Sequence, residues 1–280
     1  MRKFFIAFAM LFIMLLCLCS CSNENSNFCI QFIDVGQGDS ALIECDGHYM
    51  LIDGGDTTAG DKVYSVLEEK GIQKLDILAV SHLHTDHYGG LIKALSYASN
   101  IGVTISNSTY SSNENFGEFE HQLSINGSKI TVPSQGDKYK LGSATVEVID
   151  VASEADNDSL VLLIVYKETE FLFTGDIEEK AQTRISEKYQ NDKDEAFEVE
   201  LVKIPHHGSY TGTLYRFMRT FMPDYVIISV GAGNKYGHPD SDTLDLLNSQ
   251  TWSPKVYRTD KNGDIFVKSN GYEIFIEASK

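Results

Sequence analysis

Basic residues are scarce in this chain of 280 residues. Only 23 lysines and arginines stand against 40 aspartates and glutamates, and the formal net charge at pH 7 is −17. Proteins that bind nucleic acid regardless of its sequence gain most of their affinity by neutralising phosphates with lysine and arginine. We therefore expect no stable complex between this acidic chain and nucleic acid.

Cysteine is also rare, and three of the five cysteines lie before residue 22. The other two, Cys29 and Cys45, flank a predicted hairpin around residues 35–39 and are symmetric about Gln37. A disulfide between them is one interpretation if the protein folds in an oxidising compartment. Two small buried thiols are the other. Neither cysteine has the spacing of a zinc ligand.

Long apolar runs are confined to the amino terminus. Residues 4–16 are all apolar, follow Arg2 and Lys3, and precede Leu-Cys-Ser-Cys at 18–21. This is the layout of a secretory signal, and it is shorter than the roughly 20 residues of a membrane-spanning helix. Because the last four residues resemble a bacterial lipobox, we expect a lipoprotein signal peptide over 1–20. A lipid on Cys21 would then anchor the protein outside the cytoplasm, on the bacterial cell membrane. An ordinary cleaved signal or an uncleaved anchor is the alternative.

The rest of the chain divides into a short tether and one domain. Residues 21–27 are polar and indicate a flexible tether. Residues 28–280 contain no repeat or linker, and a pattern of strands followed by helix occurs in them twice. This pattern predicts two β-sheets stacked face to face with helices outside. The predicted strands are 29–35, 41–45, 49–53, 75–80, 144–151, 160–166, 171–174, 200–204, 225–230, 256–258, 265–268 and 272–276. The predicted helices are 60–71, 87–97, 178–189 and one near 243–247, and residues 100–137 are expected to be rich in turns.

Histidine is concentrated where one predicted strand ends. His82, His84, Asp86 and His87 directly follow the apolar run 75–80. In extended backbone His82 and His84 point the same way, and the other two face a second point beyond the bend. Imidazole nitrogen and carboxylate oxygen are ligands of Zn²⁺ and similar divalent cations. The motif therefore predicts a metal site rather than a surface loop that merely contains histidine.

Together with this motif, several further segments resemble the ComEC-like branch of the metallo-β-lactamase-fold hydrolases. The resemblance implies an α+β fold, the four-layer αββα metallo-β-lactamase sandwich, over residues 28–280. It also implies a stand-alone lipoprotein form of the ComEC hydrolase domain. The matching segments, in the family's order, are residues 33–40, 51–55, 157–161, 173–176, 204–209 and 236–239.

The resemblance further implies a site for two divalent metal ions, Zn²⁺ or, in a more oxygen-rich site, Mn²⁺. His82 and His84 would hold the first ion. Asp86 and His87 would hold the second ion. Asp176 would bridge both, because one carboxylate has two oxygens to share.

Two ligand positions are less defined. In the Pro-His-His-Gly run, His207 would complete the second site, with His206 as the alternative. Many family members supply a third histidine to the first metal from a central strand, but here no histidine lies between Gln122 and Pro205. Asp158, directly or through water, would take that place, or His121 would reach in from the turn-rich segment.

The implied activity is hydrolysis of a phosphodiester, in nucleic acid or in a cell-wall polymer, by a metal-activated water. Asp86 would orient a proton of that water. His238 would contact the phosphate or the leaving group, or else have a structural role in its loop. Asp53 would anchor the metal loop. Lys203 would be a phosphate contact, or else a solvent-facing or structural side chain. The alternative is a non-catalytic, metal-stabilised surface binding module, which the missing third histidine would explain.

Overall fold

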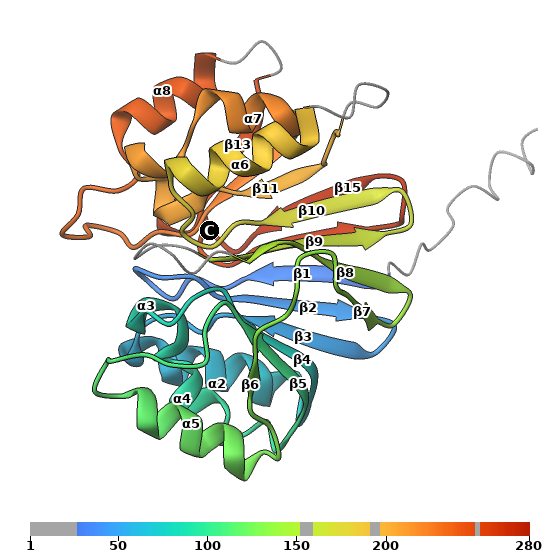
Figure 1. Ribbon diagram of the computed structural model, residues 1–280, viewed down its shortest axis with the longest axis vertical. Helices are drawn as coiled ribbons and strands as arrows, with labels where there is room; N and C mark the ends of the chain where they lie inside the picture. The colour runs from blue at the N-terminus through green and yellow to red at the C-terminus, as the bar shows by residue number, and fades with distance from the viewer. Residues whose placement is uncertain (1–26, 152–158, 191–196, 250–252) are drawn as a thin grey trace, which may run out of the picture.

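Two β-sheets lie face to face in the computed structural model, with helices on both outer faces (Figure 1). The structure describes residues 27–151, 159–190, 197–249 and 253–280. The strand order is β15-β14-β1-β2-β3-β4-β5-β6 in the first sheet and β13-β12-β11-β10-β9-β8-β7 in the second. The four-layer αββα arrangement predicted from the sequence is confirmed.

The first sheet is mixed. Its strands β1 to β3 are antiparallel neighbours, whereas β3 to β6 run parallel. The strands are β1 Phe28–Phe32, β2 Ala41–Cys45, β3 His48–Ile52, β4 Lys74–Val80, β5 Asn100–Ser106, β6 Ile130–Thr131, β14 Ile265–Ser269 and β15 Ile274–Ala278. Its outer face carries η1 Thr57–Ala59, α2 Gly60–Glu69, α3 Thr85–Tyr88, α4 Leu91–Ala94 and α5 Phe116–Ile125 (Figure 1).

The second sheet is also mixed, because β10 to β13 are parallel and β7 to β10 antiparallel. The strands are β7 Lys138–Leu141, β8 Ala144–Val151, β9 Leu160–Tyr166, β10 Thr169–Phe173, β11 Leu201–Lys203, β12 Tyr225–Ile228 and β13 Lys255–Arg258. The helical segments of this half are α6 Glu179–Gln190, η2 Pro205–Gly208, η3 Tyr210–Gly212, α7 Tyr215–Phe221, α8 Ser241–Ser249 and α9 Thr259–Asn262.

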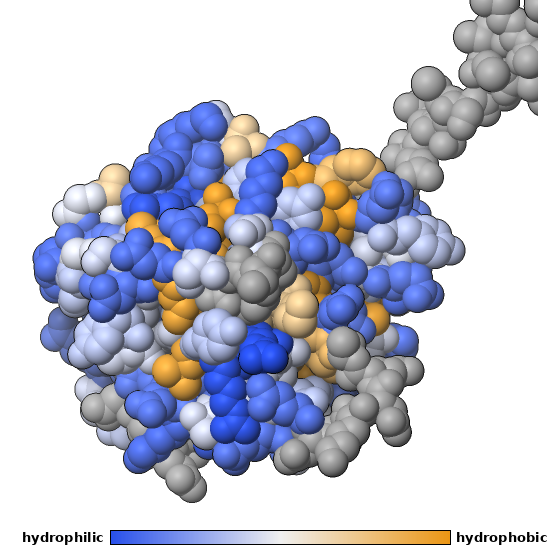
Figure 2. Space-filling model, turned by 90° about the horizontal axis from the view of Figure 1, so that it is seen from above, coloured by the Kyte–Doolittle hydropathy of each residue, from blue (hydrophilic) through white to orange (hydrophobic). Residues whose placement is uncertain are grey.

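The main hydrophobic core lies between the two sheets. Phe28 of β1 stacks on Tyr166 and Phe171, with ring centroids 4.8 and 5.0 Å apart. A separate buried cluster lies under the helices of each half. Strands such as β9 are buried on both faces, which is why their sequences are almost continuously apolar. The outer surface seen from above is mainly hydrophilic, with apolar residues in small groups (Figure 2).

Two predicted segments differ from the structure. The helix expected over 87–97 is divided into α3 and α4, because the backbone N–H of Gly90 donates to the carbonyl oxygen of Gly55 at 2.9 Å and not to that of Asp86. Only glycine fits at this position, since a Cβ on Gly90 would lie 2.0 Å from the carbonyl oxygen of Gly54. This close approach packs the loop after β3, at Gly54, against the segment that follows the metal motif. The segment expected to be turns contains β5 and α5, and α5 buries Phe116, Phe119 and Leu123 at helical spacing.

The disulfide interpretation of Cys29 and Cys45 is wrong. In the β1–β2 hairpin Cys29 is paired with Glu44 and Cys45 with Phe28, so the register is one residue away from the symmetric one. A shift of one residue places the two side chains on opposite faces of the sheet. Both thiols are free.

The predicted signal peptide over 1–20 and the lipidation site at Cys21 lie outside the described residues. The same holds for the tether except for Asn27. Within the described residues, no helix has both the length and the hydropathy to span a membrane. The organisation of the amino terminus therefore stays a prediction.

Candidate metal centre

The first sheet supplies the histidine motif at the end of β4. His84 is in extended backbone at the start of α3, and this short helix carries Asp86 and His87. The Nε2 atom of His82 lies 2.9 Å from Nδ1 of His84. The ring centroids of His82 and His87 are 4.1 Å apart. The motif thus brings its imidazoles together where a strand ends and a helix begins.

The second sheet supplies Asp176, after β10, and the histidine pair after β11. His206 and His207 both have left-handed backbone, with φ of 47° and 53°, which costs a residue with a side chain roughly 1–2 kcal/mol. This turn directs His207 into the cluster, 3.4 Å from Asp176 and 3.5 Å from Asp86. His206 instead lies 3.3 Å from Glu178. The geometry therefore favours His207 over His206 as a ligand.

In the part of the chain that the structure describes, four groups of potential ligand atoms lie in the cluster, and three of them share His87. In each group the atoms lie within 4.8 Å of one another. Two groups contain the predicted ligands alone: His82, His87 and Asp176 form one, and Asp86, His87 and His207 form the other. Asp39 joins Asp176 and His207 in the third group, and Asp53 and His87 in the fourth. The Oδ2 atom of Asp176 lies 3.3 Å from Nε2 of His87. His84 is in none of the groups, although it contacts His82.

The atoms at the centre of the cluster fit divalent metal ions. Among the described residues, Nε2 of His87, Nε2 of His207 and Oδ1 of Asp176 are buried and have no hydrogen-bond partner. Buried polar atoms are nearly always satisfied in proteins, so this convergence of orphaned atoms points to a ligand. Nitrogen and oxygen donors of this kind suit Zn²⁺, and carboxylates also suit Mn²⁺.

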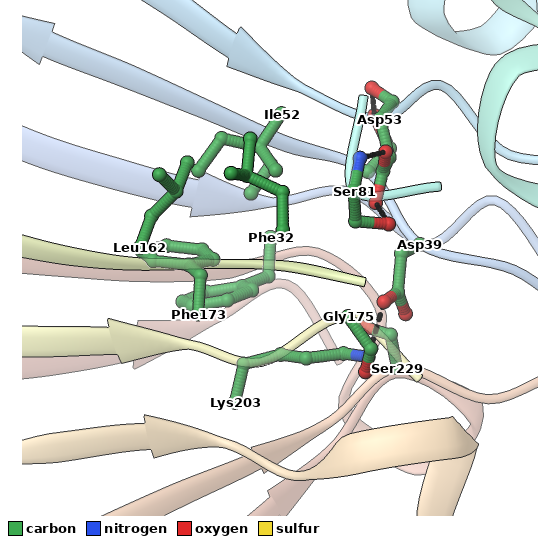
Figure 3. Close-up of a pocket in the computed structure, with 13 residues that line it drawn as sticks. Phe32, Asp39, Ile52, Asp53, Ser81, Leu162, Phe173, Gly175, Lys203 and Ser229 are labelled. Carbon is green, nitrogen blue, oxygen red and sulfur yellow. Dashed lines mark hydrogen bonds and ion pairs between the residues drawn. The ribbon is translucent and has the colours of Figure 1, made fainter. Parts of the chain in front are cut away.

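Asp53 orients His87. Its buried carboxylate accepts hydrogen bonds from the backbone N–H and the hydroxyl of Ser81, both at 2.7 Å (Figure 3). It also lies 3.0 Å from Nδ1 of His87. A proton on Nδ1 leaves Nε2 of His87 available to a metal. Burial raises the pKa of Asp53, and the nearby His87 opposes that shift. The anchoring role predicted for Asp53 agrees with these contacts.

Lys203 lies in the interior and not on the substrate side. Only 3% of its side chain is exposed, and its Nζ forms an ion pair with Asp39 (Figure 3). Burial raises the pKa of Asp39, but the charges of Lys203 and His207 outweigh burial and lower it. The phosphate-contact interpretation of Lys203 is therefore wrong, and the structural one holds.

The side chains of the cluster favour positive charge at its centre. Burial opposes ionisation of His207, yet Asp176 and Asp39 outweigh it and raise the pKa of His207 to about 10. The pKa of His87 is also raised despite burial, by Asp176 and Asp53. In contrast, burial and the neighbouring His87 lower the pKa of His82. The cluster is thus built to hold cations, protons or metal ions, next to its carboxylates.

The structure describes one of the two residues predicted to replace the third histidine of the first metal, and it does not support that one. His121 is exposed on α5, on the outer face of the first sheet, and belongs to no candidate metal group. Asp158 lies outside the described residues, so its role stays a prediction. Its neighbour Ser159 has its hydroxyl 3.3 Å from Nδ1 of His82 and accepts a hydrogen bond from the backbone N–H of Asp176.

An open cleft of about 590 Å³ borders the cluster at His84 and Asp86. Lys235 and Tyr236 line it from the loop after β12, and Asn113 lines it from the loop after β5. His238 is half-buried beside this loop, and its ring is stacked with that of Tyr236 at 5.7 Å. The cleft is of the size that accommodates a small ligand or a short stretch of polymer.

Comparison with known proteins identifies the class. Residues 33–231 match the family model of the metallo-beta-lactamase superfamily. The chain is 29% identical over 259 residues to ComE operon protein 3 of Bacillus subtilis, which covers 84% of this chain and 32% of that protein. It is 25% identical over 235 residues to competence protein ComA of Neisseria gonorrhoeae, covering 82% of this chain and 30% of that protein. The chain therefore spans about a third of the length of these curated relatives.

Solved structures agree on the fold. The metallo-beta-lactamase fold protein YhfI from Bacillus subtilis superimposes with a TM-score of 0.53 over 89% of this chain and 100% of that chain, at 12% identity. The chain belongs to the metallo-beta-lactamase superfamily, as a ComEC-like metal-dependent hydrolase. The resemblance to the ComEC-like branch of this superfamily is confirmed, whereas the lipoprotein form stays a prediction. Divalent metal ions are the cofactors that this fold implies.

Proposed function

We propose that the protein is a phosphodiesterase that uses two divalent metal ions, Zn²⁺ or Mn²⁺. The observation that carries this proposal is the buried set of orphaned imidazole and carboxylate atoms from both sheets, at the edge of an open cleft. Two ions in such a site supply Lewis acidity and a water nucleophile at neutral pH. His82 and His84 would hold one ion and Asp86, His87 and His207 the other, with Asp176 shared.

The residues around the cluster have complementary roles in this proposal. Asp86 borders the cleft and is less buried than Asp176, so it can orient a proton of the attacking water. His238 donates a hydrogen bond to the phosphate or to the leaving group. Burial is the main cause that lowers the pKa of His238, and this favours its neutral form as the donor. Lys235 is the cation that lines the cleft.

Nucleic acid and wall polymers are the two substrate classes that the proposal includes. The similarity to competence protein ComA of Neisseria gonorrhoeae supports a nucleic acid substrate. The net charge of −17, with Asp56 and Asp86 on the cleft, supports a substrate whose phosphodiester charge is offset, such as a wall polymer with choline substituents. In either case the acidic surface favours transient contact with one phosphodiester over stable binding of a long polyanion.

The proposed location is the outer side of the cytoplasmic membrane, with a lipid on Cys21. The apolar segment over 4–16 and the lipobox-like residues after it support this location. Expression in a bacterial host with a wild-type leader and with Cys21→Ala tests the proposal. We expect the wild type in the membrane fraction with an acylated amino-terminal cysteine by mass spectrometry, and release of the variant. Equal membrane retention of both would contradict lipid anchoring at Cys21.

Hydrolysis of bis-p-nitrophenyl phosphate tests the activity. Residues 22–280 would be assayed with Zn²⁺, with Mn²⁺ and with a chelator. We expect turnover that the chelator abolishes and that Asp86→Ala and Asp176→Asn both lack. The exposed Asp61→Asn on α2 is the matched control and should retain turnover. Metal binding without turnover on this probe or on polymer substrates would instead identify a metal-stabilised binding module.

A further inference from the structure

A buried lysine lies directly beneath the metal cluster. Lys203 ends β11, in the otherwise apolar strand Leu201–Lys203, and 3% of its side chain is exposed. Lysine is almost never buried to this extent unless its charge is paired. Its partner Asp39 comes from the loop between β1 and β2, in the other half of the sandwich (Figure 3). The ion pair therefore joins the two halves at the point where their ligands meet.

Lys203 also contacts the turn that carries the shared carboxylate. Its Nζ donates a hydrogen bond to the carbonyl oxygen of Gly175 at 3.0 Å and lies 3.8 Å from Oδ1 of Asp176. Gly175 has a φ of 54°, and a Cβ there would lie 2.6 Å from the Cβ of Ser159. The turn at Gly175 is therefore packed closely against Ser159, and the hydrogen bond from Lys203 fixes its other side.

The space around Lys203 excludes a direct role toward substrate. The cavity beside it has a volume of about 20 Å³ and is lined by Asp39, Ser81 and Gly175 among others (Figure 3). Such a volume accommodates about one water molecule. Lys203 is absent from the residues that line the large cleft. Lys203 can therefore affect the reaction only indirectly, through its contacts with Asp39, Gly175 and Asp176.

The charge of Lys203 also changes the balance of the site. Asp39, Asp53, Asp86 and Asp176 contribute four carboxylates around the cluster. Two divalent ions would offset these four charges, and the ammonium group of Lys203 adds one positive charge beneath them. This charge partly offsets Asp56, which lines the cleft, and so favours an anionic phosphodiester there.

We propose that Lys203 is a positioning residue that fixes Asp176 for metal binding, beyond its pairing with Asp39. This inference rests on the two-metal site of the proposed function. Three variants separate the two roles: Lys203→Met, Asp39→Asn and the double variant. Met has nearly the length of Lys without its charge, and Asn has the shape of Asp without its charge.

The first measurement is urea unfolding of the three variants and the wild type in the presence of a chelator. Lys203→Met removes the ammonium partner of the buried carboxylate of Asp39 and leaves it only the histidines, so this variant should unfold at a lower urea concentration than the wild type. The double variant removes both charges and should recover most of that shift. The recovered part reports the pairing of Lys203 with Asp39, and the remainder reports the other contacts of the two side chains.

The second measurement is titration with Co²⁺, followed by its visible absorption, which reports both affinity and ligand geometry. We expect the wild type to bind two ions, and the double variant to bind at least one of them tenfold or more weakly with an altered spectrum. Asp39→Asn leaves Lys203 beside Gly175 and Asp176, and its loss of affinity should be at least threefold smaller than that of Lys203→Met.

The outcomes distinguish a Lys203 that positions Asp176 from one that only balances the charge of Asp39. Wild-type affinity and spectrum in the double variant would show that Lys203 only balances Asp39, and would overturn the inference while leaving the proposed function intact. An equal, tenfold loss of Co²⁺ affinity in Asp39→Asn and in Lys203→Met would also overturn the inference. This comparison uses only the single variants, so it does not require the double variant to fold. A wild type that binds no pair of ions would refute the proposed function itself.

Discussion

Replacing Asp53 by Asn tests whether hydrogen bonding behind the ligands controls the metal centre. Asp53 accepts hydrogen bonds from both donors of Ser81, and its Oδ2 lies 3.0 Å from Nδ1 of His87. An Asn amide keeps one oxygen for Ser81 but turns its NH₂ group toward Ser81 or His87. If it faces His87, the imidazole must accept at Nδ1 and carry its proton on Nε2. That is the atom that faces Asp176 at 3.3 Å.

The expected effect on metal binding follows from that tautomer. Groups that orient a ligating histidine typically contribute about 10–100-fold to metal affinity, which corresponds to about 1.4–2.8 kcal/mol. If the amide faces Ser81 instead, one buried donor loses its acceptor. The free energy of unfolding then falls by about 1–3 kcal/mol. Each orientation of the amide in Asp53→Asn therefore has its own measurable effect. An amide that faces His87 lowers metal affinity, and an amide that faces Ser81 lowers the free energy of unfolding.

The assay is competition for Zn²⁺ between the protein and a chromogenic chelator at pH 7.5. It is combined with ¹⁵N chemical shifts of the His87 ring, which report the tautomer. Asp61→Asn, the same chemical change at an exposed position, is the control. Zinc affinity within twofold of the wild type, with the proton still on Nδ1 of His87, would refute the reasoning.

Three further predictions concern the core, the turn and the pH dependence. Phe171→Ala removes a ring buried between the sheets; we expect urea unfolding to show a loss of about 3–5 kcal/mol with zinc affinity nearly unchanged. Gly175→Ala places a Cβ 2.6 Å from that of Ser159, and should lower the unfolding free energy by about 1–3 kcal/mol and weaken zinc binding together. His207 has its pKa raised from the ordinary 6.5 to about 10 by Asp176 and Asp39 against burial. In chelator its contribution is full below pH 6.5 and is lost as the pH rises through about 10. The stability difference between the wild type and His207→Gln should therefore shrink from pH 6 to pH 10, and a constant difference would contradict this assignment.

Local sequence was sufficient to predict where the metal motif lies, because an apolar strand followed directly by His82, His84, Asp86 and His87 has few other interpretations. The choice between His206 and His207 needed the structure. Both have left-handed backbone, which ordinary propensities disfavour, and it is this turn that sends one imidazole inward. Contacts across the sandwich impose such a conformation, and neighbouring residues along the chain do not encode it.

The features that the sequence did not predict correctly depend on strand register or on contacts between distant residues. The hairpin of Cys29 and Cys45 was predicted from symmetry, but a register one residue away reverses the face of a side chain. The helix α5 lies among Ser, Asn and Gly residues that indicate turns, although Phe116, Phe119 and Leu123 follow its period. The sequence around Lys203 does indicate a buried ion pair, since a single lysine in an apolar strand needs a partner for its charge. That partner, Asp39, is distant in sequence and could not be named from it.

The position of the cluster explains why the predicted two-metal site needs both halves of the chain. Three of the four candidate ligand groups take a member from the second half, Asp176 or His207, and the group of Asp39, Asp53 and His87 lies within the first half. The first sheet alone holds the histidine motif but lacks the carboxylate that the two sites share. The second sheet alone holds that carboxylate beside Lys203, with no imidazole from α3 opposite it. The site that includes Asp176 is therefore complete only when the sheets pack in register, so metal binding there and the packing of the sandwich stabilise each other.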